Sequence, residues 1–142
     1  MSIERTLLIV KPDAVQAGNS GNILAMLEGK GGFTLRAIRM EHLTRKSAEK
    51  FYAVHRPQPF FPDLVEFMTS GPCIPMVLEK EGAIAGLRAF IGATNPAKAP
   101  AGTIRALYGT NIQNNAVHAS DSAASATVEI AHFFPEIGVE VA

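Results

Sequence analysis

The sequence lacks the features that would mark a secreted, membrane-bound or nucleic-acid-binding protein. Its single cysteine, Cys73, excludes an internal disulfide and fits a reducing compartment. No apolar run approaches the roughly 20 residues that cross a bilayer, and the N-terminus has no basic stretch leading into an apolar one. Basic and acidic side chains balance at 13 each, so no overall charge attracts nucleic acid. We expect a cytoplasmic protein with no membrane segment and no dedicated nucleic-acid surface.

Motifs for common phosphate and metal sites are also missing. The stretch GKGG from Gly29 lacks the upstream glycine and the Ser/Thr of a P-loop, and no G-x-G-x-x-G follows an expected strand. Cys73 lies among apolar residues, which favours an inert core thiol over a nucleophile. The histidines have no cysteine or carboxylate partners at metal-ligand spacing, which argues against a structural zinc site. They are His42, His55, His118 and His132.

The length and composition predict one globular domain over residues 1–142. A chain of 142 residues that is 47% hydrophobic and 18% charged can bury a substantial core. There is no internal repeat and no low-complexity linker. We therefore expect a single domain.

Four apolar stretches have the composition of β-strands. Residues 5–10, RTLLIV, form a compact run ended by Lys11 and Pro12, which is typical of a buried strand. Residues 73–79, CIPMVLE, contain Pro75, which indicates a bulge or an edge strand. The other expected strands are residues 33–43 and a short segment containing Val117 and His118.

Helical spacing of apolar residues predicts helices between and after these strands. Thr44 can cap one helix, and Gly92 can end another. The last helix has Ala124, Val128 and Ala131 on one apolar face. The Pro/Ala/Gly stretch 94–102 has little regular pattern, and loops of that length are usually functional or mobile. This order of elements predicts an α+β sandwich with one sheet face covered by helices.

His118, in the stretch NNAVHASDS, is the residue whose surroundings indicate chemistry. It ends an expected strand and precedes the start of the final helix, where unpaired amides favour a bound anion. A neutral ring with one nitrogen fixed by a hydrogen bond could accept a phosphoryl group. Glu129 is the candidate partner, directly or through Ser120. Taken alone, an isolated histidine is more often an ordinary core or surface residue.

Three basic residues favour a functional role for His118 over that of an ordinary core or surface residue. Lys11 directly follows the first strand, Arg88 lies inside an otherwise apolar helix, and Arg105 ends the loop at GTIR. Each by itself is more often a solvated surface charge. All three lie beside elements that end in glycine, proline or a turn, where side chains converge on sites.

The chain resembles the nucleoside diphosphate kinases along its whole length. The resemblance rests on several motifs in the family's order and with near-family spacing, because a short motif such as GATNP alone would not justify it. The matching stretches are ERTLLIVKPDAV, FYAVHRPQPFFPDLVEFMTSGP, GATNP, GTIRALYG and NAVHASDS.

The resemblance implies both an activity and a fold. Members of the family transfer the γ-phosphoryl group of a nucleoside triphosphate to a nucleoside diphosphate, by a ping-pong cycle through a phosphohistidine. Their fold is a ferredoxin-like α/β sandwich, an α+β fold with a four-stranded antiparallel sheet covered by helices. This agrees with the strands and helices expected above.

The family's functional residues match positions of this sequence. His118 would be the nucleophile, with Glu129 orienting its ring, Ser120 as intermediary and Tyr52 packed against it. Asn115 would bind the 3′-hydroxyl of the sugar. The residues expected to hold the phosphates are Lys11, Arg88, Thr94 and Arg105.

The base, the metal and the assembly follow from the same resemblance. Phe60, in RPQPFF, would stack on the nucleobase rather than serve as an ordinary core aromatic, and stacking tolerates any base. Mg²⁺ would arrive with the nucleotide, with no direct protein ligand and with Asp121 as the carboxylate that could touch it through water. The chain would form a homo-oligomer, a tetramer or hexamer built from dimers. The short stretch from Pro135 to Ala142 resembles bacterial members.

Three positions depart from the family pattern. Ala119 stands where the family usually has glycine after the histidine, and its methyl would crowd the backbone if the position needs positive φ. Ala101 replaces a loop proline, and Leu107 replaces an acidic residue. None of them removes a catalytic group.

The main alternative is a kinase-fold nucleotide-binding or regulatory protein with weakened catalysis. Retention of the expected catalytic and nucleotide-binding residues argues against it. A nucleic-acid-binding role on the ferredoxin-like sheet is disfavoured by the neutral charge and by the absence of a basic, aromatic strand pattern.

Overall fold

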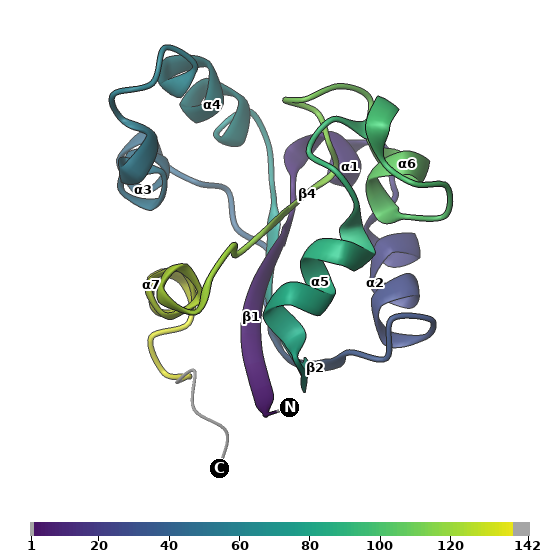
Figure 1. Cartoon of the computed structure of the whole chain (residues 1–142). Helices are drawn as coiled ribbons and strands as arrows, with labels where there is room; N and C mark the ends of the chain where they lie inside the picture. The colour runs from purple at the N-terminus through teal and green to yellow at the C-terminus, as the bar shows by residue number, and fades with distance from the viewer. Residues whose placement is uncertain (1, 138–142) are drawn as a thin grey trace.

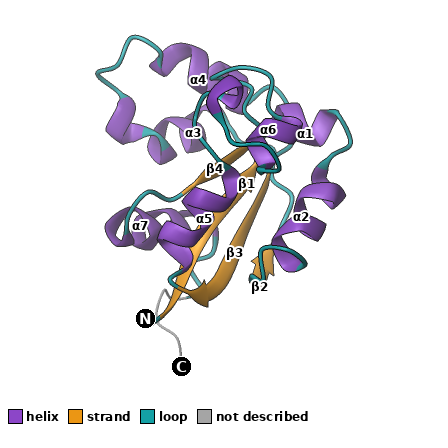
Figure 2. Ribbon diagram, turned by 45° about the vertical axis from the view of Figure 1, so that its right-hand side comes forward, coloured by secondary structure: helices purple, strands orange, loops and turns teal. Residues whose placement is uncertain are grey.

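Four antiparallel strands form the sheet at the centre of the molecule. In this computed structural model, which describes residues 2–137, the strand order is β2-β3-β1-β4. All three neighbouring pairs are antiparallel, and the long strands β1 and β3 lie side by side in Figure 2. This order is that of a ferredoxin-like α+β fold, as the sequence predicted. The strands are β1 (Ile3–Val10), β2 (Thr34–Ile38), β3 (Ile74–Glu81) and β4 (Val117–Ala119).

Helices cover both faces of the sheet, not one face as expected from the sequence. Helices α2 and α5 lie on one side of β1, and α3, α4 and α7 lie on the other (Figure 1). No helix within residues 2–137 is long and apolar enough to cross a membrane. The helices are α1 (Pro12–Gln16), α2 (Ser20–Glu28), α3 (Arg45–Phe51), α4 (Phe61–Met68), α5 (Ala83–Ile91), α6 (Ile104–Tyr108) and α7 (Ala123–Phe133), with 3₁₀ turns at Ala53–His55 and Pro96–Lys98.

The apolar run in β1 shows why both faces need cover. Successive side chains of a strand point to opposite faces, so Leu8 and Val10 join the cluster beneath α2 and α5, while Leu7 and Ile9 join the cluster beneath α3, α4 and α7. All four are completely buried. A strand buried on both sides has a continuous apolar sequence instead of an alternating one, and this is what RTLLIV shows.

Several local signals acted as the sequence predicted. The Thr44 hydroxyl accepts a hydrogen bond from the Ser47 amide at 3.1 Å and begins α3. Gly92, with φ of 94°, ends α5, and a side chain there would collide with Thr103. Pro75 is different, because β3 is an internal strand and not an edge. The carbonyl of Pro75 accepts a hydrogen bond from the Arg39 amide, so the backbone of Pro75 faces the β2 side of β3. The last paired residue of β2 is Ile38, opposite Met76. The N–H that proline lacks would therefore point beyond the end of β2, and no ladder hydrogen bond is lost.

The predicted apolar face of α7 is wrong. Ala124, Val128 and Ala131 are exposed, and Val128 has 70% of its surface accessible. The buried residues are instead Ala126, Ile130 and Phe133. The second stripe contains the two largest apolar side chains of the helix, so turning it inward removes more apolar surface from water. In the stretch from Pro135 to Ala142, residues 138–142 lie outside the described part of the chain.

Candidate active site

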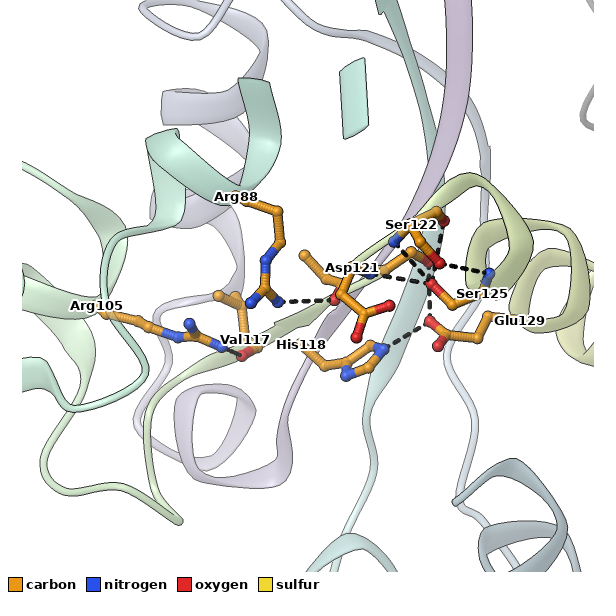
Figure 3. A network of polar contacts seen from close by, with 10 residues as sticks. Arg88, Arg105, Val117, His118, Asp121, Ser122, Ser125 and Glu129 are labelled. Atoms are coloured by element: carbon orange, nitrogen blue, oxygen red, sulfur yellow. Dashed lines mark hydrogen bonds and ion pairs between the residues drawn. The ribbon is translucent and has the colours of Figure 1, made fainter. Parts of the chain in front are cut away.

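His118 lies in β4, opposite Ile9 of the central strand, and one of its ring nitrogens is fixed by a carboxylate. His118 Nε2 is 2.7 Å from Glu129 Oε1 on α7 (Figure 3). The Ser120 hydroxyl donates to the same oxygen at 2.8 Å. Of the two arrangements considered from the sequence, the contact is therefore the direct one, and Ser120 supports Glu129 instead of relaying it. Nδ1 of His118 has no hydrogen-bond partner within residues 2–137.

A cleft of about 440 Å³ opens beside the His118 ring. It brings together seven of the residues predicted from the sequence, from five separate parts of the chain. Arg88, Ser120, Asp121 and Glu129 do not line it, and of these Ser120 and Glu129 lie behind the histidine. The lining residues are Lys11, Tyr52, His55, Phe60, Leu64, Thr94, Arg105, Ile112, Gln113, Asn115 and His118.

Aromatic rings pack against the edge of the histidine. The Tyr52 ring centroid lies 6.0 Å from that of His118 at an interplanar angle of 86°, and the Phe51 centroid lies 5.4 Å away at 72°. The Tyr52 hydroxyl is buried and has no hydrogen-bond partner among residues 2–137, and burial raises the pKa of this phenol well above its usual range. It therefore stays protonated and is a hydrogen-bond donor at any physiological pH.

The outer part of the cleft is apolar and half exposed. Phe60 has 48% of its surface accessible, and Ile112 has 61%. Both line the cleft together with Leu64, and the His55 ring lies 5.5 Å from that of Phe60. Phe60 was predicted, whereas Ile112, Leu64, His55 and Gln113 were missed. For Ile112 a signal existed, because it is the one large apolar residue in the polar stretch TNIQNN.

The cations of the site come from three elements and differ in exposure. Lys11 directly follows β1 and is 7% exposed, and its ammonium donates to Asn115 Oδ1 at 2.8 Å. Burial and the nearby Arg105 lower the pKa of Lys11 to about 8, although Asp13 opposes this. Burial, followed by repulsion from Arg88, lowers the pKa of Arg105 to about 10.

The two arginines hold the backbone of β4. Arg105 Nη2 donates to the Val117 carbonyl at 2.8 Å, and Arg88 Nη1 donates to the Ala119 carbonyl at 3.3 Å (Figure 3). Both guanidinium groups therefore lie on the strand that carries His118. A guanidinium has five donor hydrogens, so each arginine keeps donors for an anionic ligand.

Asn115 connects the cleft to the loop after α5. It is 2% exposed, and its Nδ2 donates to the Thr94 carbonyl at 3.0 Å while its Oδ1 accepts from Lys11. Thr94 itself is exposed and lines the cleft. One Nδ2 hydrogen and one Oδ1 lone pair remain for a ligand.

Ala119 causes no backbone strain. Among the non-glycine residues of 2–137 only Ala116 has positive φ, so position 119 does not require glycine. The Ala119 methyl is buried in the apolar cluster with Leu8. Leu107 is 55% exposed on α6, and Ala101 is exposed in the preceding loop.

Carboxylates near the site do not form a metal cage. Within residues 2–137 no group of three or more His, Cys, Asp or Glu side chains could hold a metal ion. Asp121 is exposed just before the N-cap of α7, and hydrogen bonds from Ser125, aided by Ser122 and Arg88, hold its pKa below the usual range. It is therefore ionised at neutral pH.

Comparison with known proteins gives a consistent result over nearly the whole chain. The family model for nucleoside diphosphate kinase matches residues 4–139. The chain is 57% identical to the nucleoside diphosphate kinase of Burkholderia cenocepacia (strain HI2424) over 139 residues, which cover 98% of each protein. It is 54% identical to that of Anaeromyxobacter sp. (strain Fw109-5), covering 98% of this chain and 94% of the relative.

Solved structures agree. The crystal structure of the Aquifex aeolicus nucleoside diphosphate kinase superposes with a TM-score of 0.93 at 45% identity, covering 98% of this chain and 100% of that one. The enzyme from Encephalitozoon cuniculi superposes with a TM-score of 0.91 at 34% identity, covering 98% and 94%.

Proposed function

Because the chain belongs to the nucleoside diphosphate kinase family and has this enzyme's activity, we propose that His118 is the phosphoryl acceptor of a ping-pong cycle. The observation that carries the proposal is the fixed ring. Glu129 holds Nε2 at 2.7 Å, so the lone pair of Nδ1 is the one available to a phosphorus atom in the cleft. The chain is proposed to be a single domain of this kind.

The two half-reactions balance at His118. In the first, the Nδ1 lone pair attacks the γ-phosphorus, the bond from that phosphorus to the β,γ-bridging oxygen breaks, and the nucleoside diphosphate leaves with the electron pair. The positive charge on the ring is stabilised by Glu129, which accepts the hydrogen bond from Nε2–H. In the second, a terminal oxygen of another diphosphate attacks the phosphohistidine, and the electron pair returns to Nδ1. Ser120 keeps Glu129 in place by its 2.8 Å hydrogen bond.

The phosphates are proposed to lie between the cations. Lys11 and Arg105 line the cleft, and Arg88 holds the carbonyl one residue after His118. Positive groups fixed before the reaction stabilise the equatorial oxygens without rearranging in the transition state. The Thr94 hydroxyl and the protonated Tyr52 hydroxyl are further donors.

The nucleoside is proposed to lie toward the apolar outer part of the cleft. Phe60 and Ile112 are both half exposed there, and a flat base placed between them would be read by its face. Such contacts do not depend on the polar edge of the base, so several bases would be accepted. Asn115, with its remaining donor and acceptor, is proposed to bind the sugar 3′-hydroxyl.

Mg²⁺ is proposed to be held mainly by the nucleotide. The residues that line the cleft include no carboxylate, so phosphate oxygens and waters, and not the protein, would supply the oxygen ligands that Mg²⁺ prefers. When bound, the ion neutralises phosphate charge. Asp121 is the candidate for a contact through water. A homo-oligomer of four or six chains and a cytoplasmic location complete the proposal.

A labelling experiment tests the proposed acceptor. The protein is incubated with γ-labelled ATP and Mg²⁺, and we expect acid-labile, base-stable label that moves to added GDP. The His118→Asn variant should take up no label, while His42→Asn, which removes an exposed histidine bonded to the Thr69 carbonyl, should label as the wild type does. Label retained in a folded His118→Asn variant would contradict the assignment, and a folded, nucleotide-binding wild type without label would favour the catalytically weakened alternative.

A further inference from the structure

The backbone between Asn115 and His118 contains a strained turn. The Val117 amide donates to the Asn115 carbonyl at 2.9 Å, which closes a three-residue γ-turn centred on Ala116. Ala116 has φ of 74° and is completely buried. γ-Turns with positive φ at a residue with a side chain are rare, and they persist only where surrounding groups determine the conformation.

Both peptide groups of Ala116 are held by residues near the start of α1, namely Lys11, which lies between β1 and α1, and Asp13, in the first turn of α1. The Ala116 amide donates to Asp13 Oδ2 at 3.1 Å, and the Ala116 carbonyl accepts from the Lys11 amide at 2.8 Å. The same Lys11 binds the side chain of Asn115 with its ammonium. The turn is therefore fixed by contacts that are about a hundred residues away in the sequence, and one of these contacts comes from a side chain.

The turn lies between two residues of the candidate site, so its conformation determines how they are placed relative to each other. Asn115, on one side, lies in the cleft, and His118 follows two residues after Ala116 on the other side. If the Ala116 peptide relaxed to negative φ, the direction of the chain between these two residues would change. A displacement of about 1 Å at a reacting group can reduce a rate about 10²-fold.

We propose that Asp13 is a positioning residue for phosphoryl transfer, because its carboxylate holds the γ-turn that sets His118 relative to Asn115. Asp13 does not line the cleft, so it acts through the turn and not on the nucleotide. This inference rests on the proposed role of His118. The second carboxylate oxygen, Oδ1, is buried and has no partner in the structure. A buried oxygen without a partner opposes folding, so stability alone does not explain the carboxylate.

A different explanation is that Asp13 only stabilises the first turn of a helix. An acidic residue is favourable there, and α1 begins with Pro12 followed by Asp13. Helix α4 offers a matched case, because Pro62 and Asp63 occupy its first turn in the same order. Asp63 is exposed and does not line the cleft beside His118. Asp63→Ala is therefore the control for loss of a helix-terminal carboxylate.

The experiment measures the single-turnover rate of phosphoenzyme formation together with nucleotide affinity. Asp13→Ala should lower the phosphorylation rate about 10- to 100-fold and change the affinity less. Asp13→Asn, whose amide oxygen can still accept from the Ala116 amide, should stay within about threefold of the wild type. Asp63→Ala should leave the rate unchanged. An Asp13→Ala rate equal to that of Asp63→Ala would overturn the proposal.

The asparagine variant separates the turn from a charge effect. The Asp13 charge also favours the protonated form of Lys11, so loss of the charge alone could weaken the site. Asp13→Asn removes the charge and keeps the hydrogen bond. If it is as slow as Asp13→Ala, Asp13 acts by its charge and the positioning role is wrong.

Glycine at position 116 provides the second test. Glycine adopts positive φ without strain, so Ala116→Gly in the Asp13→Ala background should restore much of the lost rate. If Asp13→Ala fails to fold, the double variant still tests the proposal. With glycine at position 116 the turn needs no support from Asp13, so the double variant should fold and transfer the phosphoryl group. A double variant as slow as Asp13→Ala, or one that stays unfolded, would overturn the proposal.

The labelled site keeps this test separate from that of the proposed function. Label on the wild type that is lost in His118→Asn establishes the acceptor whatever Asp13 does. A wild type without label overturns the proposed function, and the positioning role with it.

Discussion

His118 and His132 touch the same aromatic ring but have opposite surroundings. The Phe51 centroid lies 5.4 Å from the His118 ring and 5.3 Å from the His132 ring. Nε2 of His118 is held by the Glu129 carboxylate at 2.7 Å, whereas Nε2 of His132 lies 3.0 Å from the Ser47 hydroxyl. The two residues share a neighbour and differ in the charge of their partner.

This difference explains why His118 and not His132 is the proposed phosphoryl acceptor. A carboxylate stabilises the positive ring that forms during transfer, and a hydroxyl does so much less. Burial and the positive charge of Lys50, only partly opposed by Glu41, lower the pKa of His132. Its surroundings therefore disfavour a positive ring, so the partner and not the residue type determines the role.

The largest expected effect comes from replacing each histidine by asparagine. His118→Asn removes the only proposed acceptor and should lower kcat by at least about 10³-fold, whereas His132→Asn should keep kcat within about threefold. Steady-state kinetics with ATP and GDP measure both. If the His132→Asn variant folds but is as inactive as His118→Asn, the two histidines do not differ in role as proposed.

The next effect comes from the partners of the two rings. Glu129→Gln keeps the shape of the side chain but removes its charge, and should lower kcat about 10²-fold with a smaller change in KM. Ser47→Ala, the matched change beside His132, should lower stability by about 1 kcal/mol without affecting kcat. Kinetics and chemical denaturation measure these outcomes, and equal kcat losses in the two variants would contradict the role given to charge.

A smaller, pH-dependent effect should mark the cation beside the His118 cleft. The pKa of Lys11 is lowered to about 8, and a bound phosphate favours its protonated form. The affinity of the protein for a nucleoside diphosphate should therefore be greatest below pH 8. It should fall as the pH rises above 8, by up to about tenfold per pH unit. Titration calorimetry across this range measures the effect. Lys11→Met should bind more weakly with a flatter profile, and an unchanged slope in this variant would assign the titration to another group.

The smallest effect concerns the stability contributed by His132. Its folded-state pKa is below the unfolded value of 6.5, so the unfolded chain binds more protons between these two values. Stability contributed by the neutral ring is present above pH 6.5 and is lost as pH falls toward the folded pKa. Denaturation at several pH values should show a shallower acid-side decrease for His132→Gln than for the wild type. An identical decrease would show that this ring does not titrate on unfolding.

Local signals predicted much of the fold. Thr44 and Gly92 act through their own backbone and nearest neighbours, so their roles could be predicted from the sequence. The apolar run RTLLIV likewise predicts a strand that is buried on both faces, whichever elements cover it. The face of α7 was predicted wrongly although a signal was present, because Ala124 and Ala126 are equally apolar while Ile130 and Phe133, the largest apolar side chains of the helix, lie on the buried stripe.

The site was predicted where the residue types are chemically distinctive, and missed where the role depends on tertiary contacts. Lys11 follows the end of β1 as expected, whereas His118, expected to end its strand, is the middle residue of β4. Ile112, Phe51 and Asp13 are ordinary residues in the sequence, and each becomes relevant only through a surface that the folded chain provides. Propensity and spacing carry no information about which side chain of a short helix meets a turn a hundred residues later.

The central place of β1 also determines when the enzyme can begin to work. The first strand is flanked by the third and the fourth, and it brings Lys11 to Asn115 and Ile9 to His118, residues that are more than a hundred positions apart. Contacts of such long sequence separation form slowly. During synthesis, a chain that ends before α7 lacks the carboxylate that fixes the histidine. With Glu129 in its proposed role, catalytic competence therefore arises only after α7 has been synthesised and has packed against β1, as a late product of folding.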